Sequence, residues 1–185
     1  MANKKFLTGI IMLVCMVVLS ACGSSSTHPS SDKKNNMNME GMEMSGSNEV
    51  PKGLKTAENP TFKVGSKAVI KADHMEGMNG AKATIVGAYD TIAYTVTYTP
   101  TTGGPEVKNH KWVIQEEIKN AGTQALKPGT KVILEADHMK GMMGAKGTID
   151  SAEHTTVYMV DYTPVNGGAP VKNHEWVTES ELSTK

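Results

Sequence analysis

Residues 92–99 read IAYTVTYT, and this stretch decides the fold of the chain. Tyr94, Val96 and Tyr98 alternate with threonines, which is the pattern of a β-strand with two chemically different faces. A proline follows the stretch and ends the strand. The same pattern returns at residues 157–162, VYMVDY. The chain is therefore expected to be mainly β.

The strand belongs to a longer repeat. Residues 65–117 align with residues 129–181 at a constant offset of 64 without a gap, and 29 of the 53 aligned positions are identical. Such self-similarity indicates two copies of one small domain, for which we expect boundaries at 60–120 and 124–185. Within the first copy, the short β-segments expected are 67–72, 83–88, 92–99 and 109–113, followed by a polar helical turn at 115–118. Four or five short strands in about 55 residues suit a small open barrel of the SH3-like kind, with inward Tyr, Val, Ile and Trp as its core. The predicted fold is two tandem SH3-like barrels.

The first 21 residues are typical of a signal peptide. Lys4 and Lys5 precede an apolar run over 6–19, which leads into Leu-Ser-Ala immediately before Cys22. A charged start, a short apolar run and a small-residue cleavage site define such a signal, whereas a membrane-spanning helix needs about 20 apolar residues. The cysteine directly after alanine resembles a bacterial lipoprotein signal, in which Cys22 carries the lipid. An ordinary secretory signal or a membrane anchor is the alternative.

A flexible tether is expected over residues 22–59, because this segment has no aromatic residue and few β-branched ones. Within it lie four closely spaced methionines, Met37, Met39, Met42 and Met44. Methionine in an exposed segment has no packing role, and its thioether is a soft ligand suited to Cu(I) or Ag(I). Drift in a low-complexity linker, or protection by oxidation of methionine, are the alternatives.

Composition excludes several classes of function. The 19 basic residues are all Lys and are balanced by 19 acidic ones, which argues against nucleic-acid binding. Cys15 leaves with the signal and Cys22 carries lipid, so no disulfide or thiolate zinc site is expected. The sequence has no nucleophile elbow, phosphate loop or His-Glu-x-x-His pair, and we expect no enzyme.

A nearly identical block in each repeat suggests a metal site. It reads ADHMEGMNGAK at 72–82 and ADHMKGMMGAK at 136–146. An imidazole and two thioethers within five residues match the ligands that copper prefers, Cu(I) above all. The predicted ligands are His74, Met75 and Met78 in the first copy, and His138, Met139 and Met142 in the second. A second shared block, Val-Lys-Asn-His, adds His110 and His174 as candidates.

Packing is the alternative for both blocks. Methionines can fill the open end of a barrel, because the thioether side chain adapts to irregular gaps. The histidines can form hydrogen bonds in a turn or pack at the end of a strand. The second copy also carries an extra methionine, Met143, so the two loops need not be equivalent.

With the lipobox, the Met-rich tether and the tandem His-Met-x-Gly-Met blocks, the sequence resembles the YdhK-like family of bacterial lipoproteins. The resemblance extends over nearly the whole chain. Some members are similar to extracellular copper-binding lipoproteins associated with copper-resistance genes, which implies copper binding here. The resemblance does not identify the ligands.

We therefore expect a monomeric protein, lipid-anchored to the outer face of the cell membrane, that sequesters Cu(I) and contributes to copper tolerance. Cu(II) and Ag(I) are the alternative ions, and copper-export machinery or the cell wall are the expected neighbours. The competing hypothesis is a cell-wall-binding or scaffold lipoprotein, in which the His-Met loops are structural.

Overall fold

A computed structural model describes residues 49–184, which belong to one compact unit. The expected signal peptide over 1–21, the lipidation site Cys22 and the four tether methionines, Met37, Met39, Met42 and Met44, lie outside the described residues.

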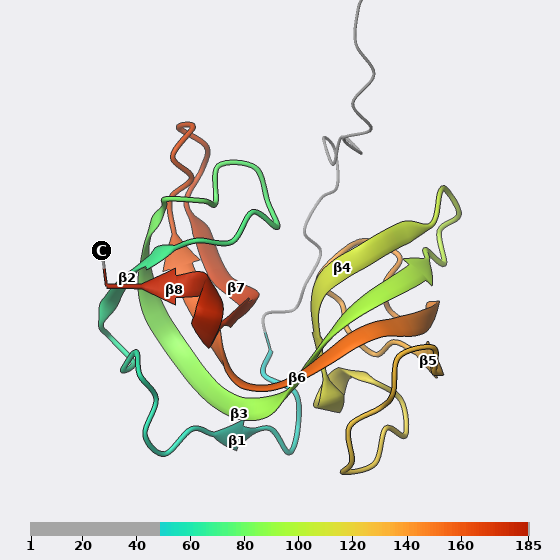
Figure 1. The fold of residues 1–185 in the computed structure, drawn as a ribbon. Helices are drawn as coiled ribbons and strands as arrows, with labels where there is room; N and C mark the ends of the chain where they lie inside the picture. Colours follow the sequence, from blue (N-terminus) through green and yellow to red (C-terminus); the bar gives the residue numbers. More distant parts are fainter. Residues whose placement is uncertain (1–48, 185) are drawn as a thin grey trace, which may run out of the picture. The chain divides into compact units, whose positions relative to one another are not determined.

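The described chain is mainly β, as predicted. Its strands are β1 (Lys55–Thr56), β2 (Lys67–Ile70), β3 (Lys82–Thr99), β4 (Val107–Ile114), β5 (Lys131–Ile133), β6 (Lys146–Tyr162), β7 (Val171–Thr178) and β8 (Leu182–Ser183). Two short 3-10 turns, η1 (Gln115–Glu117) and η2 (Glu179–Glu181), follow β4 and β7. All eight strands are hydrogen-bonded into one sheet (Figure 1). Within residues 49–184, no helix has the length and apolar character needed to cross a membrane.

Two long strands form the centre of the sheet. The predicted segments 83–88 and 92–99 are parts of a single strand, β3, because the residues between them include no proline and stay paired. β3 lies antiparallel to β6 from Ala83 opposite Tyr162 to Thr99 opposite Lys146 (Figure 1). β3 comes from the first repeat and β6 from the second, so the longest pairing in the sheet joins the two copies.

The remaining strands pair along these two. β2 pairs with the first part of β3, and β8, from the end of the second repeat, pairs with β2. β4 pairs with the second part of β3, while β5 and β7 pair with the first and second parts of β6. The repeats are thus clear in sequence, but the strands of each are distributed over both halves of the sheet.

Two large hydrophobic cores and one smaller cluster around the two tryptophans result, and each contains residues of both repeats. The first core is formed by residues 57–88 together with 158–182, the two ends of the described chain. The second core is formed by the continuous stretch 92–149. Tyr94, Val96 and Tyr98 are at most 1 % exposed in the second core, which confirms the predicted inward face of that strand.

The described structure extends into the segment predicted as tether. The tether was expected to reach residue 59, whereas residues 55–56 form β1 opposite Tyr89 and Asp90 of β3. The backbone N–H of Ala57 also donates to the carbonyl of Ala88, at 3.0 Å. Backbone pairing of this kind leaves no trace in composition, because any residue with an N–H and a C=O can supply it.

Candidate metal centre

The methionines of the His-Met loops lie against the cores. Met78 and Met142 are fully buried and Met139 is 3 % exposed. Met75 is partly buried and packs against the first core. This is the placement that the packing alternative expects, with thioethers acting as core side chains.

The loop histidines instead meet glutamates of the other repeat. His138 Nε2 lies 2.7 Å from Glu117 Oε1, and His74 Nε2 lies 2.8 Å from Glu181 Oε1. His138 belongs to the second repeat and Glu117 to the first, whereas His74 belongs to the first and Glu181 to the second. Each imidazole is therefore held by a carboxylate that only the interleaved sheet brings near.

The 3-10 turns fix these glutamates in place. Glu117 Oε2 accepts the backbone N–H of Ile114 at 3.0 Å, and the Glu117 carbonyl accepts the N–H of Glu135 at 2.7 Å. Glu181 repeats the arrangement, with Thr178 N–H at 3.1 Å from Oε2 and Lys71 N–H at 2.8 Å from its carbonyl. Each turn is thus tied to the strand that leads into the histidine loop.

A tryptophan completes each pair. Trp176 Nε1 donates to Glu117 Oε1 at 3.1 Å, and Trp112 Nε1 donates to Glu181 Oε2 at 2.8 Å. Both tryptophans follow a cis peptide bond and belong to a small cluster of buried apolar side chains from β3, β4, β6 and β7. Because indole N–H groups only donate, each fixes one carboxylate oxygen of its glutamate.

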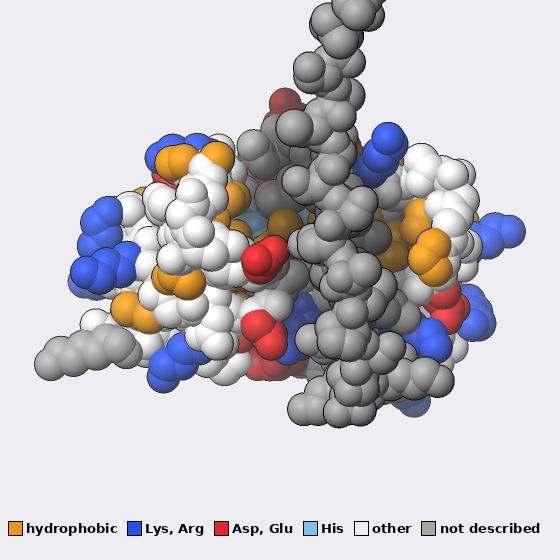
Figure 2. All heavy atoms as spheres, turned by 90° about the horizontal axis from the view of Figure 1, so that it is seen from above, with side chains coloured by type: hydrophobic (Ala, Val, Ile, Leu, Met, Phe, Trp, Pro, Cys, Tyr) orange, Lys and Arg blue, Asp and Glu red, His pale blue; other side chains and the backbone are white. Residues whose placement is uncertain are grey.

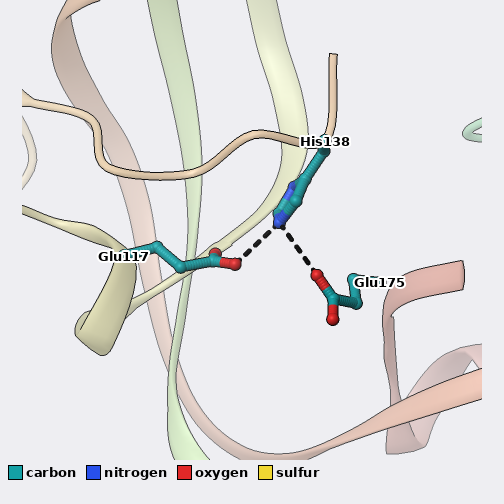
Figure 3. Close-up of side chains that lie close together, drawn as sticks. All are labelled: Glu117, His138 and Glu175. Atoms are coloured by element: carbon teal, nitrogen blue, oxygen red, sulfur yellow. Dashed lines mark hydrogen bonds and ion pairs between the residues drawn. The ribbon is translucent and has the colours of Figure 1, made fainter. Parts of the chain in front are cut away.

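One of the two pairs has a further carboxylate beside it. Glu175 Oε2, on β7, lies 3.7 Å from His138 Nε2, the same nitrogen that Glu117 contacts, and the two carboxylates approach it from different directions (Figure 3). Glu117, His138 and Glu175 each offer a ligand atom, and the three atoms lie within 4.8 Å of one another. Their side chains are only 5, 8 and 10 % exposed. One nitrogen and two oxygens at this spacing could hold a metal ion after small movements, since metal–ligand bonds to N and O are about 2.0–2.2 Å.

The three side chains place two carboxylates and one imidazole together in a buried setting, which shifts the pKa values of His138 and Glu175. Burial raises the pKa of Glu175 to about 7; the charge of His138 opposes this shift, and the charge of Glu117 adds to it. Burial by itself lowers the pKa of His138, but the charge and hydrogen bond of Glu117, helped by Glu175, outweigh it and raise that pKa above 6.5. Glu175 Oε1 is buried and has no hydrogen-bond partner among the described residues. A cation between the carboxylates would satisfy both the charge and the free oxygen.

The group opens into an acidic pocket of about 410 Å³. Six carboxylate residues line it, namely Glu49, Glu116, Glu117, Glu135, Asp137 and Glu175. Lys52 is the single lysine among the lining residues, and Met143, the extra methionine of the second loop, is 51 % exposed there. On the face drawn in Figure 2, hydrophobic and histidine surface lies within a recess, and acidic side chains lie at its rim. A pocket of this charge raises the local concentration of cations.

His110 and His174 lie close to this centre but outside the three-residue group. The rings of His110 and His138 are 6.3 Å apart. Burial, followed by the charges of neighbouring histidines, lowers the pKa of both His110 and His174 to about 3, so both are neutral at pH 7. His110 Nε2 and both ring nitrogens of His174 lack hydrogen-bond partners among the described residues.

Sequence reasoning missed the glutamates. Glu117 and Glu181 occupy equivalent positions in the repeat alignment, which was the available signal, but they lie in a polar stretch where carboxylates are common. Glu175 has no acidic counterpart, because Lys111 occupies its position in the first repeat. Only the pairing between repeats reveals that the three side chains converge.

Comparison with known proteins identifies the family. A family model described as "Protein of unknown function (DUF1541)" matches residues 64–115 and again 128–179. The chain belongs to this DUF1541 family and carries two copies of its domain.

Relatives of known sequence or structure agree. The chain is 57 % identical over 188 residues to "Uncharacterized protein YdhK" of Bacillus subtilis strain 168, covering all of this chain and 92 % of that protein. A crystal structure of the B. subtilis DUF1541 family protein ydhK matches with a TM-score of 0.73 and 64 % identity, over 74 % of this chain and 93 % of that one. A second ydhK crystal structure matches with a TM-score of 0.63 and 67 % identity, over 65 % of this chain and 98 % of the other. The chain is thus a YdhK homologue.

Proposed function

We propose that this protein binds copper outside the cytoplasmic membrane, where a lipid on Cys22 anchors it, and that it buffers copper for tolerance. The observation that supports metal binding is the group Glu117, His138 and Glu175 at the base of an acidic pocket. The resemblance to lipoproteins associated with copper resistance supports copper as the ion. Binding without turnover is sufficient for this role.

The donor set favours a particular oxidation state. One imidazole nitrogen and two carboxylate oxygens suit Cu(II), and also Zn(II), better than Cu(I), which prefers sulfur ligands. We therefore assign Cu(II) to the pocket and Cu(I) or Ag(I) to the tether methionines Met37, Met39, Met42 and Met44. His138 must be deprotonated at the nitrogen that binds the ion, so metal uptake releases protons.

One double variant and a matched control test the pocket. The full chain in detergent is titrated with Cu(II) and Zn(II), first as wild type and then with Glu117→Gln and Glu175→Gln together. We expect at least a tenfold loss of Cu(II) affinity, because both anionic ligands are removed while size is kept. His154→Ala is the matched control, since His154 is exposed and belongs to neither His–Glu pair. Unchanged Cu(II) binding in the double variant would rule out the pocket as the metal site.

The tether is tested separately with Cu(I) and Ag(I). Replacing its four methionines by serine is expected to lower Cu(I) capacity and to leave Cu(II) binding in the pocket unchanged. Equal losses for both ions would contradict the division between the two regions.

Anchoring has its own experiment. Cys22→Ala is expected to release the protein from the membrane fraction, whereas Cys15→Ala, within the apolar run of the signal, is expected to leave it there. Retention of the Cys22→Ala protein in that fraction would contradict lipidation at this site.

The cell-wall alternative receives little support from the aromatic side chains. Tyr94, Tyr98, Tyr158 and Tyr162 and both tryptophans are at most 7 % exposed, and only Tyr89 is partly exposed. Buried rings cannot stack against a wall polymer.

A further inference from the structure

The two His–Glu pairs are related by the repeat, yet they differ at one position. His74 corresponds to His138, Glu181 to Glu117 and Trp112 to Trp176, each at the offset of 64 or its reverse. The fourth position is Lys111 in one repeat and Glu175 in the other. We call the set His74, Glu181 and Lys111 the lysine group, and the set His138, Glu117 and Glu175 the glutamate group.

The differing residues hold equivalent positions in the repeat, and each reaches the His–Glu contact of its own group, although the Lys111 side chain is 42 % exposed and that of Glu175 is 10 % exposed. Lys111 Nζ lies 3.7 Å from Glu181 Oε1, the oxygen that also contacts His74. Glu175 Oε2 lies 3.7 Å from His138 Nε2, the nitrogen that contacts Glu117. Each residue directly precedes its tryptophan, on β4 or β7. A cation bound by the glutamate group would therefore have a covalently attached counterpart, the Lys111 ammonium, in the lysine group.

The consequence for metal binding follows from charge and ligand count. The lysine group has a single carboxylate, and the ammonium of Lys111 lies 3.7 Å from it, with the lysine side chain 42 % exposed. An arriving cation would therefore meet a like charge beside that carboxylate and would find only two ligands. The glutamate group has two carboxylates and no cationic side chain other than His138. Lys111 is also held over the ring of Trp112, 5.4 Å from its centroid, which is a favourable site for an ammonium.

We propose that Lys111 acts as a built-in cation in the lysine group, so that the two-repeat domain binds one divalent ion rather than two. On this view the residue at positions 111 and 175 determines which group accepts metal. The inference rests on the proposed metal site and specifies its stoichiometry and its determinant.

Charge exchange between the two positions provides the test. The full chain in detergent is prepared as wild type, Lys111→Glu, Glu175→Lys and the double exchange Lys111→Glu with Glu175→Lys. Zn(II) is the probe, because the thioethers of the tether are poor ligands for it compared with imidazole and carboxylate. Bound zinc is counted by elemental analysis after gel filtration, and the titration is followed by calorimetry.

The expected stoichiometries are distinct. Wild type binds one ion, Lys111→Glu two, and Glu175→Lys none. The double exchange binds one, now at the lysine-group position, and imidazole NMR signals of His74 rather than His138 shift on titration. Lys111→Gln removes the ammonium without adding a ligand, and it is expected to stay at one ion.

Each failure has a different meaning. No zinc on the wild-type chain would contradict the metal site itself. One ion on wild type and still one on Lys111→Glu, or two on wild type, would overturn the role of Lys111 while leaving the metal site intact. Near-ultraviolet circular dichroism of the tryptophans confirms folding, and the double exchange, which keeps the net charge, decides the question if Lys111→Glu alone does not fold.

Discussion

His174 packs edge-on against Tyr162, 5.7 Å between ring centroids, and is 5 % exposed. Neither of its nitrogens has a hydrogen-bond partner among the described residues. An unsatisfied buried polar group costs about 1–3 kcal/mol, so His174→Leu is expected to leave the free energy of unfolding at pH 7 unchanged or to raise it. This stability is expected if His174 only packs in the core. Loss of Cu(II) binding in His174→Leu would instead identify His174 as a metal ligand.

The same variant makes a prediction about acid stability. The pKa of His174 is lowered to about 3, from 6.5 for an exposed histidine, by burial and the neighbouring His74 and His138. The unfolded chain therefore takes up this proton first, and stability is lost as pH falls from 6.5 towards 3. Thermal unfolding at pH 7.0 and 4.5 should show a smaller drop for His174→Leu than for wild type. Identical drops would contradict the buried, neutral state of His174, and His154→Leu serves as the exposed control.

Glu181, unlike the neutral His174, is stabilised in its charged form. Burial raises its pKa, but hydrogen bonds from His74, Thr178 and Trp112, together with the charge of His74, outweigh burial and lower the pKa to about 2. A depressed carboxylate pKa stabilises the fold above about pH 4.5, and this contribution is lost as pH falls towards 2. Glu181→Gln should lower the free energy of unfolding by about 2 kcal/mol at pH 7, with the difference disappearing near pH 2. A difference independent of pH, measured by urea unfolding, would contradict this.

At the scale of elements, the His-Met loop of each repeat docks on the turn after the long strand of the other. The backbone N–H of Thr101 donates to the carbonyl of Gly141 at 2.9 Å, and that of Val165 donates to the carbonyl of Gly77 at 2.9 Å. At position 141 only glycine fits, for two reasons. Its φ is +81°, and a Cβ there would lie 2.6 Å from Thr102 Oγ1 and 3.2 Å from Pro100 Cβ.

Two alanine substitutions separate these grounds. Gly144 has a φ of +75° but no atom within 4 Å of an added Cβ, so Gly144→Ala should cost about 1 kcal/mol from the left-handed backbone alone. Gly141→Ala adds a steric clash and should cost about 2 kcal/mol or more. The measurement is the free energy of unfolding in urea. Equal losses for the two variants would show that the close contact of Gly141 with the neighbouring turn does not contribute to stability.

The strands could be predicted from the sequence, but their pairing partners could not. Alternation of Tyr, Val and Thr predicts the strands and their inward faces correctly, since both depend on local residue order. It cannot determine strand partners, because the two copies present nearly identical edges and a strand can pair within its own copy or with the other. The pairing between copies brings Glu117 to His138. Because this pairing could not be predicted from the sequence, the metal group could not be predicted either.

For the whole molecule, the interleaved cores predict which fragments fold. Residues 91–153 contain every buried residue of the second core, although they span the end of one repeat and the start of the next. Residues 60–122, a fragment of equal length that follows the repeat in sequence, contain β3 without its partner β6.

We expect the fragment 91–153 to unfold cooperatively as a monomer. The fragment 60–122 should be unfolded or self-associated, because β3 would expose unpaired N–H and C=O groups along its length. Circular dichroism and gel filtration distinguish these states. Cooperative, monomeric folding of 60–122 with failure of 91–153 would contradict the interleaved arrangement.

The crossing of the histidine–glutamate pairs also limits how the two copies can diverge during evolution. A substitution at Glu117 removes the partner of a histidine in the other copy. Selection on one copy therefore also constrains the sequence of the other. Positions 111 and 175 differ from this pattern, because they carry opposite charges, Lys and Glu, and so distinguish two pairs that are otherwise equivalent.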